Sequence, residues 1–196
     1  MTPSTILLIR HAQSTWNAAG RWQGQADPPL SPAGLEQAAQ LATSPRLASI
    51  DTLCCSDLQR ARQTADAIAA AQHLPVVELP DLREVDVGSW SGRSRAEIEA
   101  AEPGAMDRYA AYGGGWIGGE SVEQHGERCH AAVRQLLQLD GDRVAAVTHG
   151  GTMRMLVVAL LGLSDEDRSR FAGSGHATVT ELRRRSHGWQ LASYGA

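Results

Sequence analysis

Thr5-Ile6-Leu7-Leu8-Ile9-Arg10-His11-Ala12-Gln13-Ser14-Thr15-Trp16-Asn17 is the stretch around which the rest of the sequence can be understood. It opens with four consecutive apolar residues, Ile6 to Ile9, which lack helical spacing. Such a run is typical of a strand buried on both faces. Ligands bind beyond the carboxyl ends of these strands, where Arg10 and His11 follow. The pair therefore suits an anion and acid–base or nucleophilic chemistry, unless it only marks where the strand meets solvent.

A second apolar strand ends in the same way. Val144 to Val147 runs into Thr148-His149-Gly150-Gly151. In a parallel sheet both histidines would project from the same edge. The two glycines allow backbone N–H groups to approach a ligand closely, and they stand at the start of a predicted helix, which favours an anion. Two histidines at matching strand ends, one of them beside an arginine, therefore indicate a site.

The remaining pattern alternates buried strands, loops and helices. It predicts a three-layer α/β/α sandwich with a mostly parallel central sheet, in a single domain over residues 1–196. Serine followed three residues later by Glu or Gln is a capping box, which predicts helix starts after Ser56, Ser94 and Ser121; Ser31-Pro32 predicts another. Further strands are expected at 50–55, 76–79, 177–182 and 189–194, further helices at 152–161 and near 165–170, and a glycine-rich loop at 113–121.

Composition narrows the functional classes. The 196 residues include 18 basic and 22 acidic side chains, for a net charge of −4, so nothing attracts nucleic acid or anionic membrane in general. No apolar run is long enough to span a membrane, and no signal peptide is evident. Three cysteines without a Cys-x-x-Cys spacing argue against disulfides and a thiolate metal site. We expect a cytoplasmic protein, for which a homodimer is one possible assembly.

Six motifs in order resemble those of the histidine phosphatase superfamily, which includes the cofactor-dependent phosphoglycerate mutases. The opening Arg10-His11 stretch resembles that family's Arg-His-Gly motif. The others are Gln23-Gly24-Gln25-Ala26-Asp27-Pro28-Pro29-Leu30-Ser31, Ser56-Asp57-Leu58-Gln59-Arg60-Ala61-Arg62-Gln63-Thr64-Ala65, Leu82-Arg83-Glu84 with Gly88, Trp90 and Gly92, Gly119-Glu120-Ser121, and Thr148-His149-Gly150-Gly151-Thr152. The resemblance covers nearly the whole chain and implies a phosphoglycerate mutase-like fold.

The resemblance also implies a phosphoryl-transfer site. His11 would be the nucleophile and form a phosphohistidine, while Arg10, Arg60 and His149 would surround the phosphoryl oxygens. Glu84 would protonate the leaving alkoxide and then activate water, a double role that predicts a carboxyl pKa raised toward neutral. The remaining phosphate- or substrate-binding residues would be Asn17, Gln23, Gly24 and Gly150. No metal and no cofactor are expected, because the arginines supply the charge.

Two positions test this interpretation. A helical wheel places Arg62 closer than Arg60 to the apolar face of its helix, but the family match and the first-turn position favour Arg60 in the site. Arg62 would then form surface salt bridges. At position 12 the family usually has glycine, and Ala12 predicts a small loop shift rather than loss of function.

Other polar residues are weaker candidates. The sequence offers no partners for four histidines, for which surface roles are expected: His73, His125, His130 and His187. A structural role is expected for His176, although it could approach the site, and Glu120 would lie near the pocket rim or cap a loop. A His/His/Glu metal site lacks a supporting motif. The five tryptophans suit packing and lid roles rather than nucleic-acid stacking.

The family contains both phosphatases and mutases. Mutase-type members carry a longer segment with paired arginines before Gly119-Glu120-Ser121, where this chain is short. Asp86 after Glu84 would repel a substrate carboxylate. These features favour a metal-independent phosphomonoester hydrolase acting on a small phosphorylated metabolite, such as a sugar phosphate or phosphoglycerate derivative. The alternatives are a cofactor-dependent phosphoglycerate mutase and a non-catalytic relative that binds a phosphorylated ligand.

Overall fold

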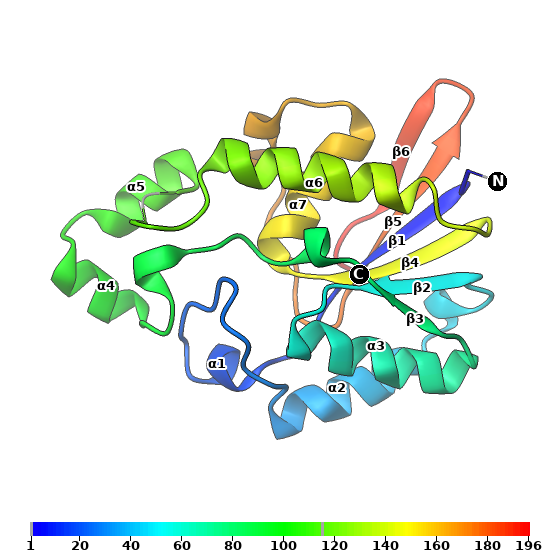
Figure 1. The fold of residues 1–196 in the computed structure, drawn as a ribbon, viewed down its shortest axis with the longest axis horizontal. Coiled ribbons are helices and arrows are strands. Elements are labelled where there is room, and N and C mark those ends of the chain that lie inside the picture. Colours follow the sequence, from blue (N-terminus) through cyan, green and yellow to red (C-terminus); the bar gives the residue numbers. More distant parts are fainter. Residues whose placement is uncertain (1, 115) are drawn as a thin grey trace.

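A computed structural model describes residues 2–114 and 116–196, with the side chains at 111 and 112 left out (Figure 1). Gly115 of the predicted glycine-rich loop lies outside the described residues. The strands are β1 (Thr5–Arg10), β2 (Thr52–Cys55), β3 (Val76–Glu78), β4 (Arg143–Thr148), β5 (Val179–Arg185) and β6 (Gly188–Ser193). The helices are α1 (Thr15–Ala18), α2 (Pro32–Ala42), α3 (Gln59–Gln72), α4 (Arg95–Ala101), α5 (Ala105–Tyr112), α6 (Val122–Leu136) and α7 (Gly150–Leu161), and the short 3-10 helices are η1 (Pro45–Leu47), η2 (Pro80–Leu82), η3 (Gly88–Trp90) and η4 (Asp165–Arg170).

The six strands form one sheet in the order β3-β2-β4-β1-β5-β6. The four strands from β3 to β1 are parallel, and β5 and β6 add an antiparallel edge. Because β1 and β4 are adjacent, Arg10 lies opposite Thr148. The backbone N–H of His11 donates to the Thr148 carbonyl at 2.9 Å. The register therefore brings the two histidine-bearing strand ends together, as the sequence predicts.

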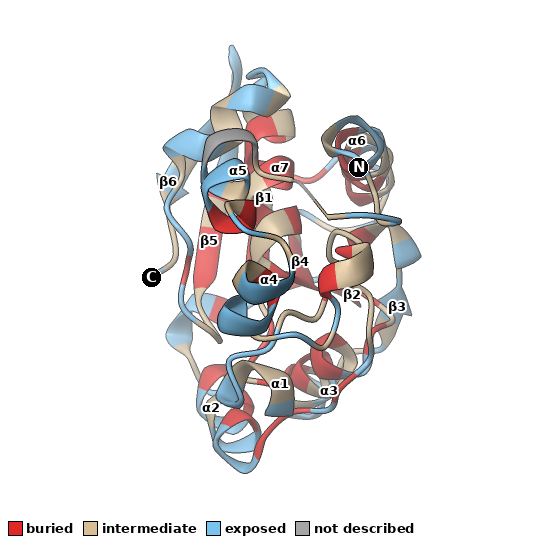
Figure 2. Cartoon of the chain, turned by 90° about the vertical axis from the view of Figure 1, so that its left-hand side faces the viewer, coloured by how far each residue is buried: buried red, intermediate tan, exposed pale blue. Residues whose placement is uncertain are grey.

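Two apolar layers pack against opposite faces of the sheet. One combines alternate residues of the strands, such as Ile6 and Leu8, with α6 and α7. The other combines the intervening residues, such as Leu7 and Ile9, with α2 and α3. The central strands are buried and the outer surfaces of the helices are exposed (Figure 2). Burial on both faces explains why the strands are continuous apolar runs, and it confirms the three-layer α/β/α architecture.

Most predicted helix starts are confirmed. Ser94 and Ser121 form complete capping boxes, and Ser31 accepts from the N–H of Gly34. The capping box at Ser56 was wrong, because the Ser56 hydroxyl accepts from Leu58 instead and α3 begins two residues later than predicted. The chain bends before the helix, and this bend precedes Arg60 in the first turn of α3.

A small apolar cluster stands apart from the sheet. Around the buried Trp90 it gathers Trp22, Tyr109 and Trp116, whose rings meet edge to face or tilted at centroid distances of 4.9 to 6.3 Å. It is built on α4 and α5, which lie beyond the carboxyl edge of the strands (Figure 1). Helix α5 was not predicted, because its eight residues lie between Gly104 and Gly113. In the described part of the chain, no helix has the length and apolar character needed to cross a membrane.

Candidate active site

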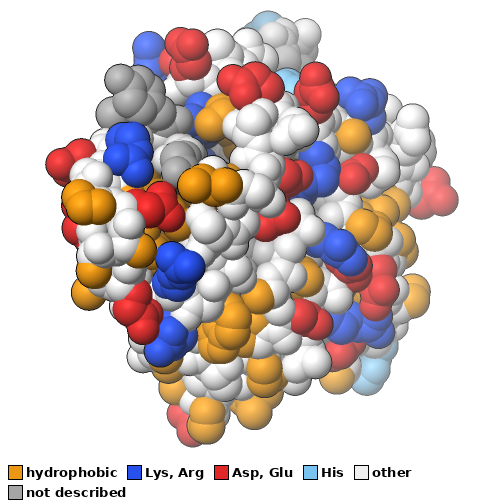
Figure 3. All heavy atoms as spheres, turned by 60° about the vertical axis from the view of Figure 1, so that its left-hand side comes forward, with side chains coloured by type: hydrophobic (Ala, Val, Ile, Leu, Met, Phe, Trp, Pro, Cys, Tyr) orange, Lys and Arg blue, Asp and Glu red, His pale blue; other side chains and the backbone are white. Residues whose placement is uncertain are grey.

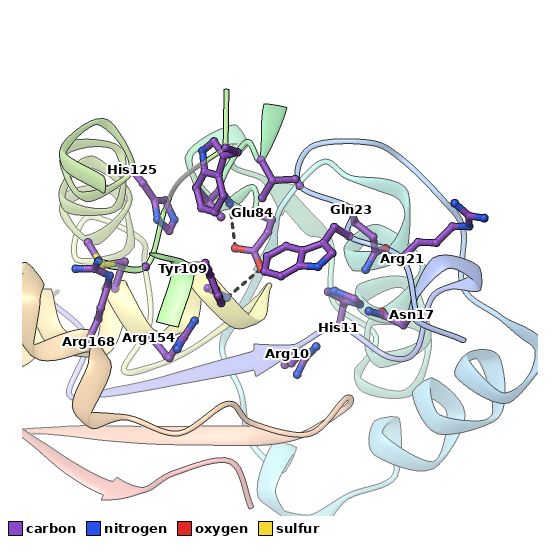
Figure 4. A pocket seen from close by; sticks show the side chains of 18 of the residues that line it. Arg10, His11, Asn17, Arg21, Gln23, Glu84, Tyr109, His125, Arg154 and Arg168 are labelled. Carbon is purple, nitrogen blue, oxygen red and sulfur yellow. Dashed lines mark hydrogen bonds between the residues drawn. The ribbon is translucent and has the colours of Figure 1, made fainter. Parts of the chain in front are cut away.

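A cavity of about 310 Å³ opens at the carboxyl edge of the sheet (Figure 4). Its wall includes His11 from the end of β1, Glu84 from the loop after η2, and residues of α3 and α7. Trp22, Tyr109 and Trp116 of the aromatic cluster form part of its rim. The predicted site residues that line it are Arg10, His11, Asn17, Gln23, Gly24, Arg60 and Glu84. Residues from five separate segments therefore meet in one cavity.

His11 is buried with one ring nitrogen fixed. Its Nδ1 lies 2.7 Å from the carbonyl oxygen of Ala12. A carbonyl can only accept, so Nδ1 carries the proton and Nε2 keeps its lone pair. Burial, together with the charges of Arg60 and Arg10, lowers the pKa of His11 well below its usual value. The ring is therefore neutral at physiological pH, as a nucleophilic imidazole must be.

His149 lies beside His11, with ring centroids 5.0 Å apart. It is fully buried, and burial followed by the charge of Arg60 lowers its pKa well below the usual value. Neither of its ring nitrogens has a hydrogen-bond partner among the described residues. His149 therefore provides a neutral N–H donor, whereas the positive charge at the site comes from the arginines.

The segment that precedes β5 holds the side chain of Arg10. Its Nη1 donates to the carbonyl of Ser174, and its Nη2 lies 3.1 Å from Nε2 of His176. Because arginine only donates, His176 accepts through Nε2. Burial and the charge of Arg10 lower the pKa of His176 to about 4, which keeps it neutral. His176 thus has the structural role expected of it: it positions Arg10, although its ring centroid lies only 6.0 Å from that of His11.

Arg60, not Arg62, enters the cavity. The Arg60 side chain is fully buried and donates to the carbonyls of Ala26 at 2.7 Å and Gly24 at 2.8 Å. Neutral carbonyls position the guanidinium without cancelling its charge, and burial lowers its pKa to about 10. Arg62 instead forms exposed salt bridges with Asp66 and Glu78. The buried face of α3 consists of Arg60, Ala61, Thr64, Ala65 and Ile68, so a helical wheel centred on the apolar residues alone misplaces the two arginines.

Gly24 has a supporting role that requires glycine. Its φ is +53°, and a Cβ there would lie 2.7 Å from the side chain of Val87 and 2.8 Å from the Val87 backbone nitrogen. A side chain would therefore both strain the backbone and collide with its neighbour. Gly24 contributes to the cavity through the carbonyl that holds Arg60.

Two amides turn their donors toward the cavity. Asn17 Oδ1 accepts from the backbone N–H of Ser14 at 3.1 Å, and Gln23 Oε1 accepts from the Ser14 hydroxyl at 2.6 Å. Since Ser14 occupies both amide oxygens, the two NH₂ groups remain as donors. Both side chains line the cavity. Asn17 and Gln23 are therefore arranged to donate neutral hydrogen bonds to an anion.

Glu84 accepts several hydrogen bonds at the start of α7. Its Oε2 accepts from Gly151 N–H at 2.9 Å, and its Oε1 accepts from the N–H groups of Thr152 and Val85, each at 3.0 Å. Burial raises the pKa of Glu84. The nearby His125, the N–H groups of Gly151 and Val85, and the charge of Arg60 together lower that pKa by more than burial raises it. Its pKa thus lies below the ordinary value, which corrects the expectation of a raised pKa. Besides His125, the backbone donors stabilise the carboxylate, and one of them, Gly151 N–H, belongs to the N-terminus of α7.

His125 was wrongly predicted to lie on the surface. It is 6% exposed, lines the cavity, and its Nε2 lies 3.0 Å from the Thr152 hydroxyl. That hydroxyl donates to the carbonyl of Arg83 at 2.7 Å, so Nε2 of His125 is the donor. Burial lowers its pKa to about 4. The signal was available, because His125 lies four residues before Cys129 on the buried face of α6.

Several remaining candidates have structural roles. Gly150 packs behind Arg10, whereas Gly151 lines the cavity. Glu120 forms an ion pair with Arg128 at 2.7 Å and accepts from the N–H of Asp86 at 2.9 Å. Asp86 is not among the cavity-lining residues, and its carboxylate accepts from Gly88 N–H. The predicted repulsion of a substrate carboxylate by Asp86 therefore loses its structural basis.

Ala12 fits its position without strain. It is fully buried, its φ is not positive, and its N–H donates to the Thr64 hydroxyl at 3.1 Å. Alanine therefore adopts this backbone without the freedom of glycine.

Charge in the cavity is strongly one-sided. The described residues that line it include one carboxylate, Glu84, and five arginines: Arg10, Arg21, Arg60, Arg154 and Arg168. On the face of the molecule shown in Figure 3, by contrast, acidic and basic side chains are interspersed. Across the described residues, no group of three or more His, Cys, Asp or Glu side chains is placed to hold a metal ion. The cavity is therefore suited to bind an anion through protein cations.

Comparison with known proteins agrees with this geometry. The profile of the histidine phosphatase superfamily (branch 1) matches residues 6–196. A metal-independent phosphoserine phosphatase of Arabidopsis thaliana is 35% identical over 197 residues, which cover 96% of this chain and 80% of that protein. A probable phosphoglycerate mutase of Salmonella paratyphi A is 35% identical over 161 residues, covering 81% and 75%.

A solved structure is also similar over nearly its full length. The mycobacterial glucosyl-3-phosphoglycerate phosphatase in complex with VO3 superposes with a TM-score of 0.90 at 31% identity, covering 98% of this chain and 99% of that one. The profile match extends from Ile6 in β1 to the end of the chain. The chain therefore belongs to branch 1 of the histidine phosphatase superfamily.

Proposed function

We propose that this chain is a metal-independent phosphomonoester hydrolase, with its site in a single catalytic domain, that acts through a phosphohistidine on a small phosphorylated metabolite. One observation carries the proposal. Buried nitrogens of Arg10 (Nε), Arg60 (Nε) and His149 (Nδ1 and Nε2) have no partner among the described residues; the His149 ring lies 5.0 Å from that of His11, and both arginines act on His11 through their charges. Buried donors are normally satisfied, and the oxygens of a tetrahedral phosphoryl group at Nε2 of His11 would accept from the two arginine Nε–H groups and from the single N–H of neutral His149.

The first step forms a bond between Nε2 of His11 and phosphorus and breaks the ester P–O bond. The electron pair of that bond leaves with the alcohol oxygen. Arg10 and Arg60 stabilise the charge on the phosphoryl oxygens, and the carbonyl of Ala12 stabilises the imidazolium through Nδ1–H. Losing one such contact typically raises the barrier by about 3–4 kcal/mol.

Glu84 is the proposed general acid and base. Its carboxylate is ionised in the free protein, but a phosphate dianion beside it disfavours that charge and raises its pKa. The proton it then takes up goes to the leaving oxygen. In the second step Glu84 accepts a proton from water, whose oxygen attacks phosphorus and releases phosphate from His11. The substrate therefore creates the acid that its own cleavage requires.

The relatives support a metabolite as the substrate. Phosphoserine and glucosyl-3-phosphoglycerate are named for two of the proteins that this chain resembles. The three described cysteines, Cys54, Cys55 and Cys129, are buried and free, which fits a reducing cytoplasm. The cytoplasmic location and the homodimer stay predictions from the sequence.

The test is hydrolysis of p-nitrophenyl phosphate in the presence of EDTA, with trapping of an acid-labile phosphoenzyme. We expect turnover in EDTA by the wild type and loss of both turnover and phosphoenzyme in His11→Ala. The exposed His187→Ala is the matched control and should behave as wild type. Absence of phosphate release by the wild type would refute the hydrolase, and turnover by His11→Ala would refute the nucleophile.

A mutase is the second candidate, because a probable phosphoglycerate mutase is among the relatives at 35% identity. Interconversion of 2- and 3-phosphoglycerate stimulated by a bisphosphoglycerate would establish that activity. Hydrolysis without interconversion is the result expected here.

A further inference from the structure

The cavity holds more positive charge than one phosphoryl group uses. Arg10 and Arg60 flank His11 and are assigned to the phosphoryl oxygens. Arg21 is accounted for as well, since its side chain is 42% exposed and pairs with Glu97. Arg154 and Arg168 lie on the side of the cavity away from Asn17 and Arg21 (Figure 4), and Arg168 donates to the carbonyl of Asp165 at 2.8 Å.

Arg154 is the informative residue of these two. It follows Gly151 by three residues, so the same side of α7 that presents the Gly151 N–H to Glu84 directs Arg154 toward the cavity. It is half-buried. In the described chain, its guanidinium has neither an ion pair nor a hydrogen bond. A partly buried cation without a partner is unfavourable, and cations of this kind are usually paired.

The charges around Arg154 do not compensate its positive charge. Its positive charge acts on Arg10 and lowers the pKa of that arginine, together with burial. The one carboxylate lining the described cavity, Glu84, is already engaged by Gly151, Thr152 and Val85. Arg154 therefore lies on this side of the cavity without an ion-pair partner among the described residues. A ligand with negative charge at that place would compensate the charge of Arg154.

The volume leaves room for such a ligand. At about 310 Å³ the cavity lies at the lower end of the range for small-molecule sites, roughly 300–1,000 Å³. The cavity lining also includes apolar and aromatic side chains: Val122, Met155, Tyr109 and Trp116. A short carbon skeleton fits this wall, with an anionic group at each end.

We propose that Arg154 forms a second anion-binding site, and that the preferred substrates are phosphomonoesters carrying a carboxylate a few atoms from the phosphate. The proposal rests on the phosphatase function and specifies its substrate class. A carboxylate matches the planar guanidinium, which can donate two parallel hydrogen bonds to it. The carboxylate also carries one negative charge, which matches the single positive charge of Arg154, whereas a second phosphate carries nearly two.

The test compares 3-phosphoglycerate with glycerol 3-phosphate. The two substrates share a three-carbon skeleton and differ in a carboxylate against a hydroxymethyl group. We expect the wild type to favour 3-phosphoglycerate in kcat/KM by roughly tenfold to a hundredfold, the range expected for a hydrogen-bonded charge pair. Arg154→Gln should remove most of that preference, and Arg154→Lys should keep part of it. Arg62→Gln is the matched control, because Arg62 forms surface salt bridges outside the cavity.

The outcomes separate the two proposals. No hydrolysis of p-nitrophenyl phosphate by the wild type would overturn the phosphatase itself. Hydrolysis of both three-carbon esters at equal kcat/KM, or an unchanged preference in Arg154→Gln, would overturn the second site alone. Propane-1,3-diol bisphosphate hydrolysed faster than 3-phosphoglycerate would overturn the carboxylate assignment. Urea unfolding tests whether both Arg154 variants are folded. If Arg154→Gln does not fold, the comparison of Arg154→Lys with the wild type still tests the second site.

Discussion

Gly151→Ala should lower activity without unfolding the protein. A Cβ at this position would lie 2.6 Å from Oε1 of Glu84 and 3.2 Å from its Cδ, while contacts under 3.0 Å are essentially never seen. The carboxylate must therefore retreat by about half an ångström or more, because it is the movable end of a side chain. Misplacement on the scale of 1 Å can cost about a hundredfold in rate, so we expect a loss of roughly tenfold to a hundredfold.

Stability should change little in the same variant. Alanine in place of glycine in a helix gains up to about 1 kcal/mol. Weakening the Gly151 hydrogen bond to Glu84, which is 2.9 Å long, costs a similar amount. The two effects oppose each other, so the free energy of unfolding should stay within about 1 kcal/mol of wild type. This prediction distinguishes a displaced catalytic carboxylate from a damaged fold.

The assay measures kcat/KM for glycerol 3-phosphate and for p-nitrophenyl phosphate, with urea unfolding alongside. An alkoxide needs a proton to leave and nitrophenolate does not, so Gly151→Ala should reduce hydrolysis of the alkyl ester more than that of the aryl ester. Gly173→Ala is the control, since a Cβ there meets nothing within 4 Å and the φ is not positive. Equal activity of Gly151→Ala and wild type on the alkyl ester would refute Glu84 as the acid.

Two further predictions concern the groups around Glu84. Glu84→Gln with p-nitrophenyl phosphate should give a burst of nitrophenol, followed by turnover about 10²–10⁴-fold slower than in the wild type, because phosphohistidine accumulates. The exposed Glu123→Gln is the control. A slowed Glu84→Gln enzyme that accumulates no phosphoenzyme would contradict the assignment of Glu84 as the base. His125 has a pKa of about 4 in the fold and an ordinary value near 6.5 when unfolded, so the unfolded chain binds its proton first as pH falls. Stability should therefore drop by about 1 kcal/mol between pH 6.5 and 5.5 through His125 alone, by urea unfolding at both pH values. Over the same pH range, His125→Gln should lose about 1 kcal/mol less stability than the wild type. The exposed His187→Gln should lose as much as the wild type. An equal loss in His125→Gln and wild type would contradict the burial of a neutral His125.

Local sequence rules predicted the fold well where the local signal was strong. Buried parallel strands require continuous apolar runs, so β1 and β4 were evident from Ile6–Ile9 and Val144–Val147. Ser94 and Ser121 were correct as helix caps because their partners lie within the same turn. The failures were at Ser56 and in α5. The start of α3 is shifted by a bend in the chain before Arg60. Helix α5 is bounded by Gly104 and Gly113, both in left-handed conformation. Contacts with neighbouring segments determine both features.

For the site, the sequence predicted which residues meet but not their protonation. His11 and His149 follow strands whose pairing was predictable, and the family motifs supplied Arg60 and Glu84. The pKa of Glu84 was mispredicted because the helix N-terminus that lowers it appears only when α7 packs beside the Glu84 loop. His125 was missed although its spacing to Cys129 places it on the buried face of α6; its hydrogen-bond partner Thr152, on another helix, could not be predicted.

The sequence alone determined the strands, most helix starts, the pair of histidines at one sheet edge and the family. These properties depend on residue type and short-range spacing, which are written in the chain. Only the tertiary structure decided the charge state of Glu84, the hydrogen bond between His125 and Thr152, and the position of Arg154 without an ion pair among the described residues. Burial and electrostatic interactions depend on distances between segments far apart in sequence, and packing sets those distances.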